Sequence, residues 1–139
     1  MWMRNQTLGV ALCALALSAC NPVADTKAAD AGVVAFHQAM DAGRYAEIYD
    51  QSSTEMKSTT SRDDFIKLLG ALHTKLGAFQ SGATTNWNDN STTGGHYVTL
   101  ERSAKFARGP GTETFVFRMD GAEAKLAGYH VNSNVLITG

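Results

Sequence analysis

The spacing of apolar residues along the chain changes from a helical period to a strand period near Gly77. Before this glycine, the residues of apolar faces recur at i, i+3, i+4 and i+7, as do Val33, Phe36, His37 and Met40, which is the spacing of one helix face. The pattern predicts helices over residues 32–42, 44–51 and 61–76, the second of them short. We therefore expect three amphipathic helices in the first part of the fold.

The third predicted helix carries the clearest start signal. Ser61 is a typical N-cap residue, and Asp63 and Asp64 place carboxylates at the positive end of the helix dipole. An apolar stripe comes next at helical spacing and consists of Phe65, Leu68, Leu69, Leu72 and Leu76. We expect this stripe to form the centre of the hydrophobic core.

After Gly77, apolar and polar positions alternate, which indicates half-buried strands. The predicted strands cover residues 79–87, 97–106, 113–119 and 125–137. They are separated by a turn-rich loop at 88–95, a Gly-Pro-Gly break at 109–111 and Asp120-Gly121. Three helices and then four consecutive strands predict an α+β fold, with N-terminal helices packed on a curved four-stranded antiparallel sheet.

The N-terminal segment has the features of an export and lipidation signal. Arg4 precedes an apolar run at 8–17, which is shorter than the roughly 20 residues that span a bilayer. Leu17-Ser18-Ala19-Cys20 then resembles the lipobox of bacterial lipoprotein signal peptides. The resemblance implies cleavage before Cys20, attachment of a diacylglycerol to its sulfur and, usually, N-acylation. A plain secretory signal with an accidental cysteine is the alternative.

These signals divide the chain into a signal peptide at 1–19, a lipidated cysteine with a flexible tether at 20–31, and one folded domain at 32–139. The tether is expected because its residues are small, polar and Pro-containing, with a helical end as the alternative. Asn21 comes directly after Cys20, and the resemblance to enterobacterial sorting signals implies the periplasmic leaflet of the outer membrane. The acyl anchor at Cys20 is the membrane contact that the sequence supports.

Composition narrows the possible chemistry. The chain has 12 basic and 13 acidic residues and a formal net charge of −1, so we expect no nucleic-acid partner. Its two cysteines are Cys13, in the apolar run, and Cys20, which leaves no thiol for a disulfide, a metal site or a nucleophile. The four histidines show no HxH or HxxxH pair, so the spacing predicts no metal site and no cofactor.

The folded domain resembles a family of bacterial exported proteins of unknown function with a nuclear transport factor 2-like (cystatin-like) α+β roll. The resemblance covers about residues 34–133 and rests on Met40-Asp41-Ala42-Gly43-Arg44-Tyr45, Leu76-Gly77, the strand at 97–106, and Asp120-Gly121 leading to Leu126-Ala127-Gly128-Tyr129-His130-Val131. Phe36, Tyr49 and Phe65 stand where the family has tryptophans. The family offers no catalytic motif to transfer, and the roll hosts isomerases, dehydratases, carriers and assembly domains.

Arg102 is the main candidate for a pocket residue. It shares the inward phase of its predicted strand, and a buried charge needs a partner. We expect Asp50 or Glu47 to supply one, and the alternative is a β-bulge that turns Arg102 outward. Tyr49 and Tyr129 complete the candidate pocket, although both also fit ordinary core aromatics with polar tips near the surface.

The sequence predicts no catalytic residues. Serine hydrolase signatures, phosphate loops and paired catalytic carboxylates are missing, and nothing in the spacing of Asp50, Tyr49 and Tyr129 singles out an isomerase-type set. We therefore expect a membrane-anchored periplasmic lipoprotein that binds another protein or a small apolar ligand. Two alternatives stay open: a small-molecule enzyme of the isomerase or dehydratase type on the same fold, and an immunity-type inhibitor of a periplasmic toxin.

Overall fold

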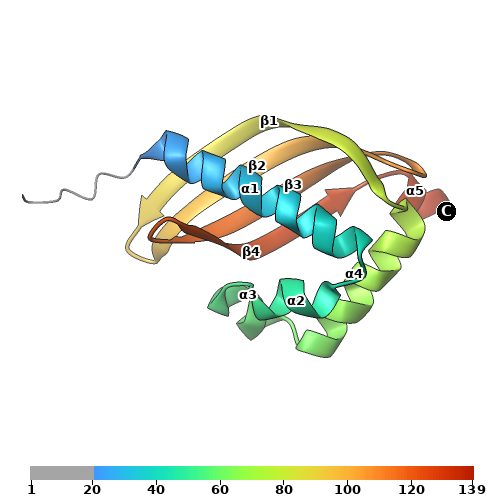
Figure 1. Ribbon diagram of the computed structural model, residues 1–139, viewed down its shortest axis with the longest axis horizontal. Helices are drawn as coiled ribbons and strands as arrows, with labels where there is room; N and C mark the ends of the chain where they lie inside the picture. Colours follow the sequence, from blue (N-terminus) through green and yellow to red (C-terminus); the bar gives the residue numbers. More distant parts are fainter. Residues whose placement is uncertain (1–20) are drawn as a thin grey trace, which may run out of the picture.

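The computed structural model describes residues 21–139, which form an α+β domain (Figure 1). Its elements are α1 (Pro22–Asp41), α2 (Tyr45–Asp50), α3 (Thr54–Thr59), α4 (Arg62–Leu76), β1 (Phe79–Thr92), β2 (Gly95–Phe106), β3 (Gly109–Asp120), β4 (Glu123–Asn132) and α5 (Val135–Thr138). This order confirms the predicted fold class. The predicted signal peptide and Cys20 lie outside the described residues.

The four strands form one open antiparallel sheet in the order β1-β2-β3-β4, so each strand pairs with the next one along the chain. Figure 1 shows α1 running along one face of the sheet, with α2, α3 and α4 grouped at the side of β4. In the part of the chain that the structure describes, no helix combines the length and the apolar character that crossing a membrane requires.

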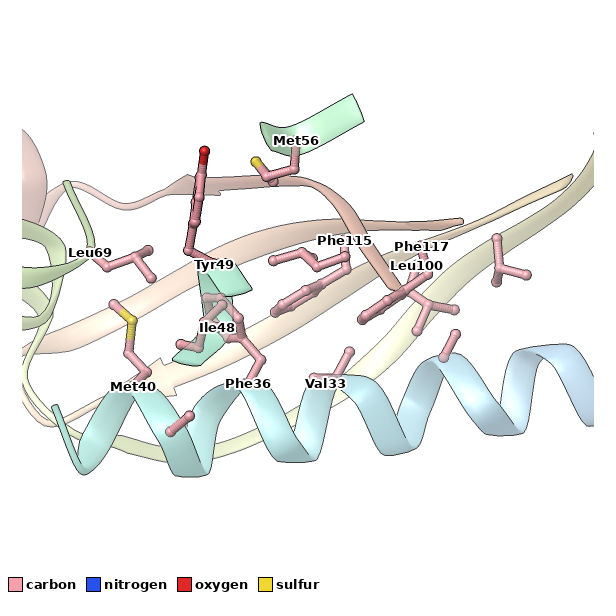
Figure 2. Packing of buried hydrophobic residues seen from close by; sticks show 14 of the residues in the cluster. Val33, Phe36, Met40, Ile48, Tyr49, Met56, Leu69, Leu100, Phe115 and Phe117 are labelled. Atoms are coloured by element: carbon pink, nitrogen blue, oxygen red, sulfur yellow. The ribbon is translucent and has the colours of Figure 1, made fainter. Parts of the chain in front are cut away.

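The core lies between α1, α2 and the inner face of the sheet. Phe115 on β3 is fully buried, and its ring meets Phe36 of α1 edge-on at 5.1 Å between ring centroids. Figure 2 shows Val33, Phe36 and Met40 pointing from α1 toward the sheet. The predicted apolar face of α1 is buried, and three more residues of this helix are buried with it: Asp25, Ala29 and Ala39.

The predicted apolar stripe of α4 is only partly buried in the structure. Ser61 caps the helix as predicted, by accepting a hydrogen bond from the Asp64 backbone N–H at 3.2 Å. The buried residues are Phe65, Leu69 and Leu76, whereas Leu72 is partly buried and Leu68 is 53% exposed. The stripe is narrower than predicted because α4 lies at the margin of the fold, where α1, α2 and α5 cover only one side of it.

The expected flexible tether is helical from residue 22 onward, which corrects the sequence prediction. The Asn21 side chain accepts a hydrogen bond from the Ala24 N–H, and Pro22 stands at the first helical position. Asp25 and Ala29 are buried against the rest of the domain. A sequence segment of low hydrophobicity is thus held as a helix by its cap and by tertiary contacts.

Three further boundaries differ from the predictions. Strand β1 continues to Thr92, because the residues predicted to form a loop pair with β2 as far as Thr92 and Gly95. Strand β3 already begins at Gly109, and the chain turns at residues 107–108 instead. Strand β4 ends at Asn132 and α5 comes next, where a longer strand was predicted. The short helix α3, capped by Ser53, was not predicted.

Candidate functional site

A buried polar cluster joins α1 to the two last strands of the sheet. His37 Nε2 lies 3.0 Å and 3.1 Å from the two carboxylate oxygens of Glu113, and the Tyr129 hydroxyl donates to Glu113 Oε1 at 2.8 Å. Glu113 is 1% exposed. A carboxylate buried to this degree is tolerated only with hydrogen-bonded partners, and these two side chains supply them.

The surroundings of this cluster fix its protonation and its geometry. Burial and the neighbouring Glu113 carboxylate raise the pKa of the Tyr129 hydroxyl, so the phenol keeps its proton and remains a donor. The His37 ring stacks on Phe79, with 3.7 Å between ring centroids and 6° between the planes. Packed aromatic rings therefore hold the His37 end of the cluster, since Phe115 also meets His37 edge-on.

Glu113 was missed from the sequence, although the strand pattern carries a signal for it. Glu113 shares the inward phase of β3 with Phe115 and Phe117, and the structure buries all three. Tyr129 lies opposite Phe115 on β4, which brings its hydroxyl within reach of Glu113 two residues along β3. The contact with His37 depends on how α1 crosses the sheet and has no sequence signal.

An open groove lies beside this cluster, between α1 and the first two strands. It encloses about 390 Å³. Its lining is Val33, Val34, His37, Gln38, Asp41, Phe79, Ser81, Gly82 and Arg102. An ionised Glu113 carboxylate can only accept hydrogen bonds, so His37 Nε2 is the donor to it, and Nδ1 has no protein partner among residues 21–139. The groove thus combines apolar walls with an imidazole and a guanidinium.

Arg102 points inward as predicted, but its expected partner was wrong. Its side chain is 12% exposed, and Nη1 lies 2.6 Å from Thr84 Oγ1 and 3.4 Å from Asp30 Oδ1. Asp50 instead forms an ion pair with Arg62, 2.9 Å from its Nε. Strand β1 and the N-terminal half of α1 cover Arg102, while α2 lies on the other side of α1, where Asp50 cannot reach it.

Glu47, the other expected partner of Arg102, pairs with Arg44 at 2.9 Å. The Tyr49 hydroxyl donates to the Thr60 backbone oxygen at 2.8 Å, and so stabilises the segment that leads into α4. The structure therefore does not bring Arg102, Asp50, Tyr49 and Tyr129 into one pocket. Of these four residues, Arg102 alone lines the groove.

Two further features are candidates for binding. A smaller groove of about 240 Å³ lies between α1, α2 and the parts of β3 and β4 near the turn that joins them. Arg44 and Glu47 are among its lining residues. At the opposite end of α1, Asp25, Asp89 and His96 bring oxygen and nitrogen atoms within 4.8 Å of one another. This group combines residues from three elements, so no spacing rule could have found it.

A comparison with protein families places the chain. The family described as protein of unknown function (DUF4019) matches residues 33–129. The chain belongs to the DUF4019 family. In this DUF4019 protein, the match runs from α1 to β4 and includes His37, Glu113, Tyr129 and Arg102, whereas Asp30 precedes it. No curated protein matches this DUF4019 chain.

Proposed function

We propose that this DUF4019 protein is a lipid-anchored protein of the bacterial envelope whose domain, a nuclear transport factor 2-like roll, binds a small amphipathic ligand in the groove beside α1. The proposal of ligand binding rests on this groove. Its volume of about 390 Å³ falls in the range of small-molecule sites, and it joins apolar walls to a few fixed polar groups.

The lining suggests the chemistry of the ligand. Val33, Val34 and Phe79 offer an apolar surface, while Arg102 offers a guanidinium that is only partly neutralised by Asp30 at 3.4 Å. The side chain of Asp30 is about half exposed and can be displaced by a ligand anion at little cost. An apolar body with an anionic or carbonyl head fits these groups.

Binding is favoured over catalysis because the interior of the roll is filled. Phe36, Phe115 and Phe117 occupy the space between α1 and the sheet (Figure 2), so the buried carboxylate of Glu113 faces protein atoms. Its two partners, His37 and Tyr129, hold it in place. His37 is the member of this cluster that lines the groove, and its contact with Glu113 fixes it in position, which lowers the ordering cost of binding.

The proposed location rests on the lipobox and on the residue directly after it. Leu17-Ser18-Ala19-Cys20 supports lipidation at Cys20, and Asn21 supports the periplasmic leaflet of the outer membrane. We expect Cys20→Ser to abolish acylation and to release the protein from membranes. Density-gradient fractionation and intact mass measure both effects. Wild-type protein that is soluble and has no acyl mass would contradict the anchor and leave the groove unaffected.

The groove is tested with two probes of equal chain length, dodecanoate and dodecanol, which differ in the charge of the head group. Binding is monitored by amide chemical shifts of the ¹⁵N-labelled protein. We expect dodecanoate to shift the amides of residues 79–82 and 102. Arg102→Met should weaken dodecanoate binding at least severalfold and change dodecanol binding little.

Arg44→Met is the matched control, because Arg44 lines the smaller groove beside α2. We expect this variant to bind dodecanoate like the wild type. Shifts that cluster around Arg44, or equal losses for both arginine variants, would contradict the proposed site. The absence of saturable shifts with either probe would contradict binding of an amphipathic ligand.

A further inference from the structure

Three metal-ligating side chains converge at the end of the sheet formed by the β1–β2 hairpin. His96 on β2 lies with Nε2 at 2.6 Å from Asp89 Oδ1 on β1 and at 3.7 Å from Asp25 Oδ2 on α1. Asp89 pairs with Val98 across the two strands, so Asp89 and His96 are diagonal neighbours. Asp25 reaches them from the first turn of α1. Figure 1 shows that α1 begins at the same end of the sheet as the β1–β2 hairpin.

The second carboxylate oxygen of Asp89 points to a missing partner. Asp89 has a side chain only 10% exposed, and its Oδ2 is buried without a hydrogen-bond partner in the part of the chain that the structure describes. Buried polar atoms are nearly always satisfied, and a charged oxygen without a partner is costly. A cation bound by Asp89 would remove this cost.

The charge of the cluster supports the same conclusion. Two carboxylates, those of Asp25 and Asp89, share a single imidazole as their ion-pairing group among the described residues. The side chains of Asp25 and His96 are 12% and 19% exposed, so solvent screens them only partly. The N-terminal end of α1 favours the negative charge of Asp25 but contributes only a partial positive charge.

We propose that Asp25, Asp89 and His96 bind a divalent transition-metal ion of the zinc class. The donor set contains one imidazole nitrogen and two carboxylates, which suits zinc better than Mg²⁺ or Ca²⁺, whose sites are built from oxygen. Zinc ligands lie about 2.1 Å from the metal, hence roughly 3 to 4 Å from one another. The 3.7 Å between Asp25 and His96 fits this geometry, and the shorter contact with Asp89 opens when its carboxylate rotates.

The site does not depend on the ligand groove, because it shares no residue with it. Three protein ligands leave at least one coordination position for water or for another molecule. Because Asp25 lies in the first turn of α1, the bound metal would connect this helix to the β1–β2 hairpin. Metal binding should therefore stabilise the domain against unfolding.

The test is a titration of the purified protein with ZnCl₂ by isothermal calorimetry after removal of metals with EDTA. Affinity tags are cleaved, and any free thiol is alkylated so that no cysteine binds zinc. We expect one zinc ion per chain and an increase of the melting temperature on zinc addition. MgCl₂ and CaCl₂ should give neither effect at the same concentration.

His96→Gln and Asp89→Asn should each weaken zinc binding at least tenfold. His73→Gln is the matched control, since His73 forms a similar pair with Asp41 at 3.2 Å but belongs to no group of three ligands among residues 21–139. Circular dichroism checks the fold of each variant. If a variant unfolds, the zinc-induced shift of the His96 ring resonances in the wild-type protein decides instead.

Three outcomes would overturn the proposal. The first is a wild-type protein without saturable zinc binding, in which His96 simply forms ion pairs with the two carboxylates. The second is zinc binding that survives in both His96→Gln and Asp89→Asn. The third is equal binding of Mg²⁺, which would exclude a role for the imidazole nitrogen.

Discussion

The Tyr129 hydroxyl donates a hydrogen bond of 2.8 Å to Glu113 across strands β3 and β4. The bond joins the last strand of the sheet to a carboxylate that α1 also contacts through His37. One acidic side chain therefore connects three elements that are distant in the sequence. Loss of the Glu113 carboxylate should therefore weaken the packing of α1 on the sheet and also remove the hydrogen bonds that this carboxylate accepts.

Tyr129→Phe should lower the free energy of unfolding by about 1 to 3 kcal/mol, because it leaves a buried charged acceptor with one partner fewer. Urea denaturation measures this effect. Tyr45→Phe is the control, since the Tyr45 hydroxyl has no hydrogen-bond partner among the described residues, and its removal should change stability by less than about 0.5 kcal/mol. Equal effects of the two substitutions would show that the Tyr129 hydroxyl contributes nothing specific.

The same tyrosine predicts a loss of stability in alkaline solution. Its pKa is raised in the folded state, so folding favours the protonated phenol. This contribution is fully present below the pKa of about 10 of an unfolded tyrosine and declines as the pH rises above that value. Denaturation between pH 8 and 11 should show a smaller decline for Tyr129→Phe than for the wild type. A decline of the same size in both would contradict the prediction.

Leu68 and Leu69 are neighbours on α4 with opposite environments. Leu69 is 1% exposed and Leu68 is 53% exposed. We expect Leu69→Ala to cost about 2 to 5 kcal/mol and Leu68→Ala less than about 1 kcal/mol in chemical denaturation. Ser61→Ala, which removes the N-cap, should fall between them at about 0.5 to 2 kcal/mol. A larger cost at Leu68 than at Leu69 would mean that the buried face of α4 is wrong.

Arg102 and Asp30 should be weakly coupled. Their contact is long, at 3.4 Å, and the Asp30 side chain is 47% exposed, so a double-mutant cycle with Arg102→Met and Asp30→Asn should give about 0.2 to 1 kcal/mol. Arg102→Met combined with Asp50→Asn is the control and should be additive within about 0.5 kcal/mol. Coupling with Asp50 and none with Asp30 would restore the pairing expected from the sequence.

Asp50 makes a small contribution to the stability of the fold that is lost at acid pH. Its hydrogen bonds to Arg62 lower the pKa of its carboxyl group in the folded state. The stabilisation is therefore present above the unfolded pKa of about 3.9 and is lost as the pH falls through the lower folded value. A carboxyl carbon NMR titration should find the Asp50 midpoint below about 3.9, and Arg62→Met should return it toward that value. A midpoint unaffected by Arg62→Met would exclude the ion pair in solution.

The fold class could be predicted from local patterns because most of them are determined by neighbours in the sequence. The Ser61 cap, the helix end at Gly77 and the alternation in β2 each depend on residues that are close along the chain. The segment 88–92 was wrongly predicted as a loop because its composition is typical of turns. Pairing with β2 outweighs this preference, since the ladder satisfies its backbone groups and Asp89 meets His96.

The candidate site was harder to predict because its residues meet through the crossing of α1 over the sheet. The inward phase of Arg102 could be recognised from alternation, but its partner depended on which part of α1 lies over β1 and β2. His37 was recognised only as a residue of an apolar face. Its contact with Glu113 spans 76 positions of the chain and has no local signature.

In the proposed lipidated form, the helical start of the domain would limit the distance between the domain and the bilayer. An extended segment over residues 21–31 would allow a reach of up to roughly 40 Å, whereas in the structure these residues form the cap and the first turns of α1, which rises about 1.5 Å per residue. In the proposed lipidated form, Asn21, the cap of that helix, would come directly after the acylated cysteine. The folded domain would then lie against the lipid headgroups in a restricted set of orientations. The end with the β1–β2 hairpin would face the lipid surface, and the C-terminal end would face the periplasm.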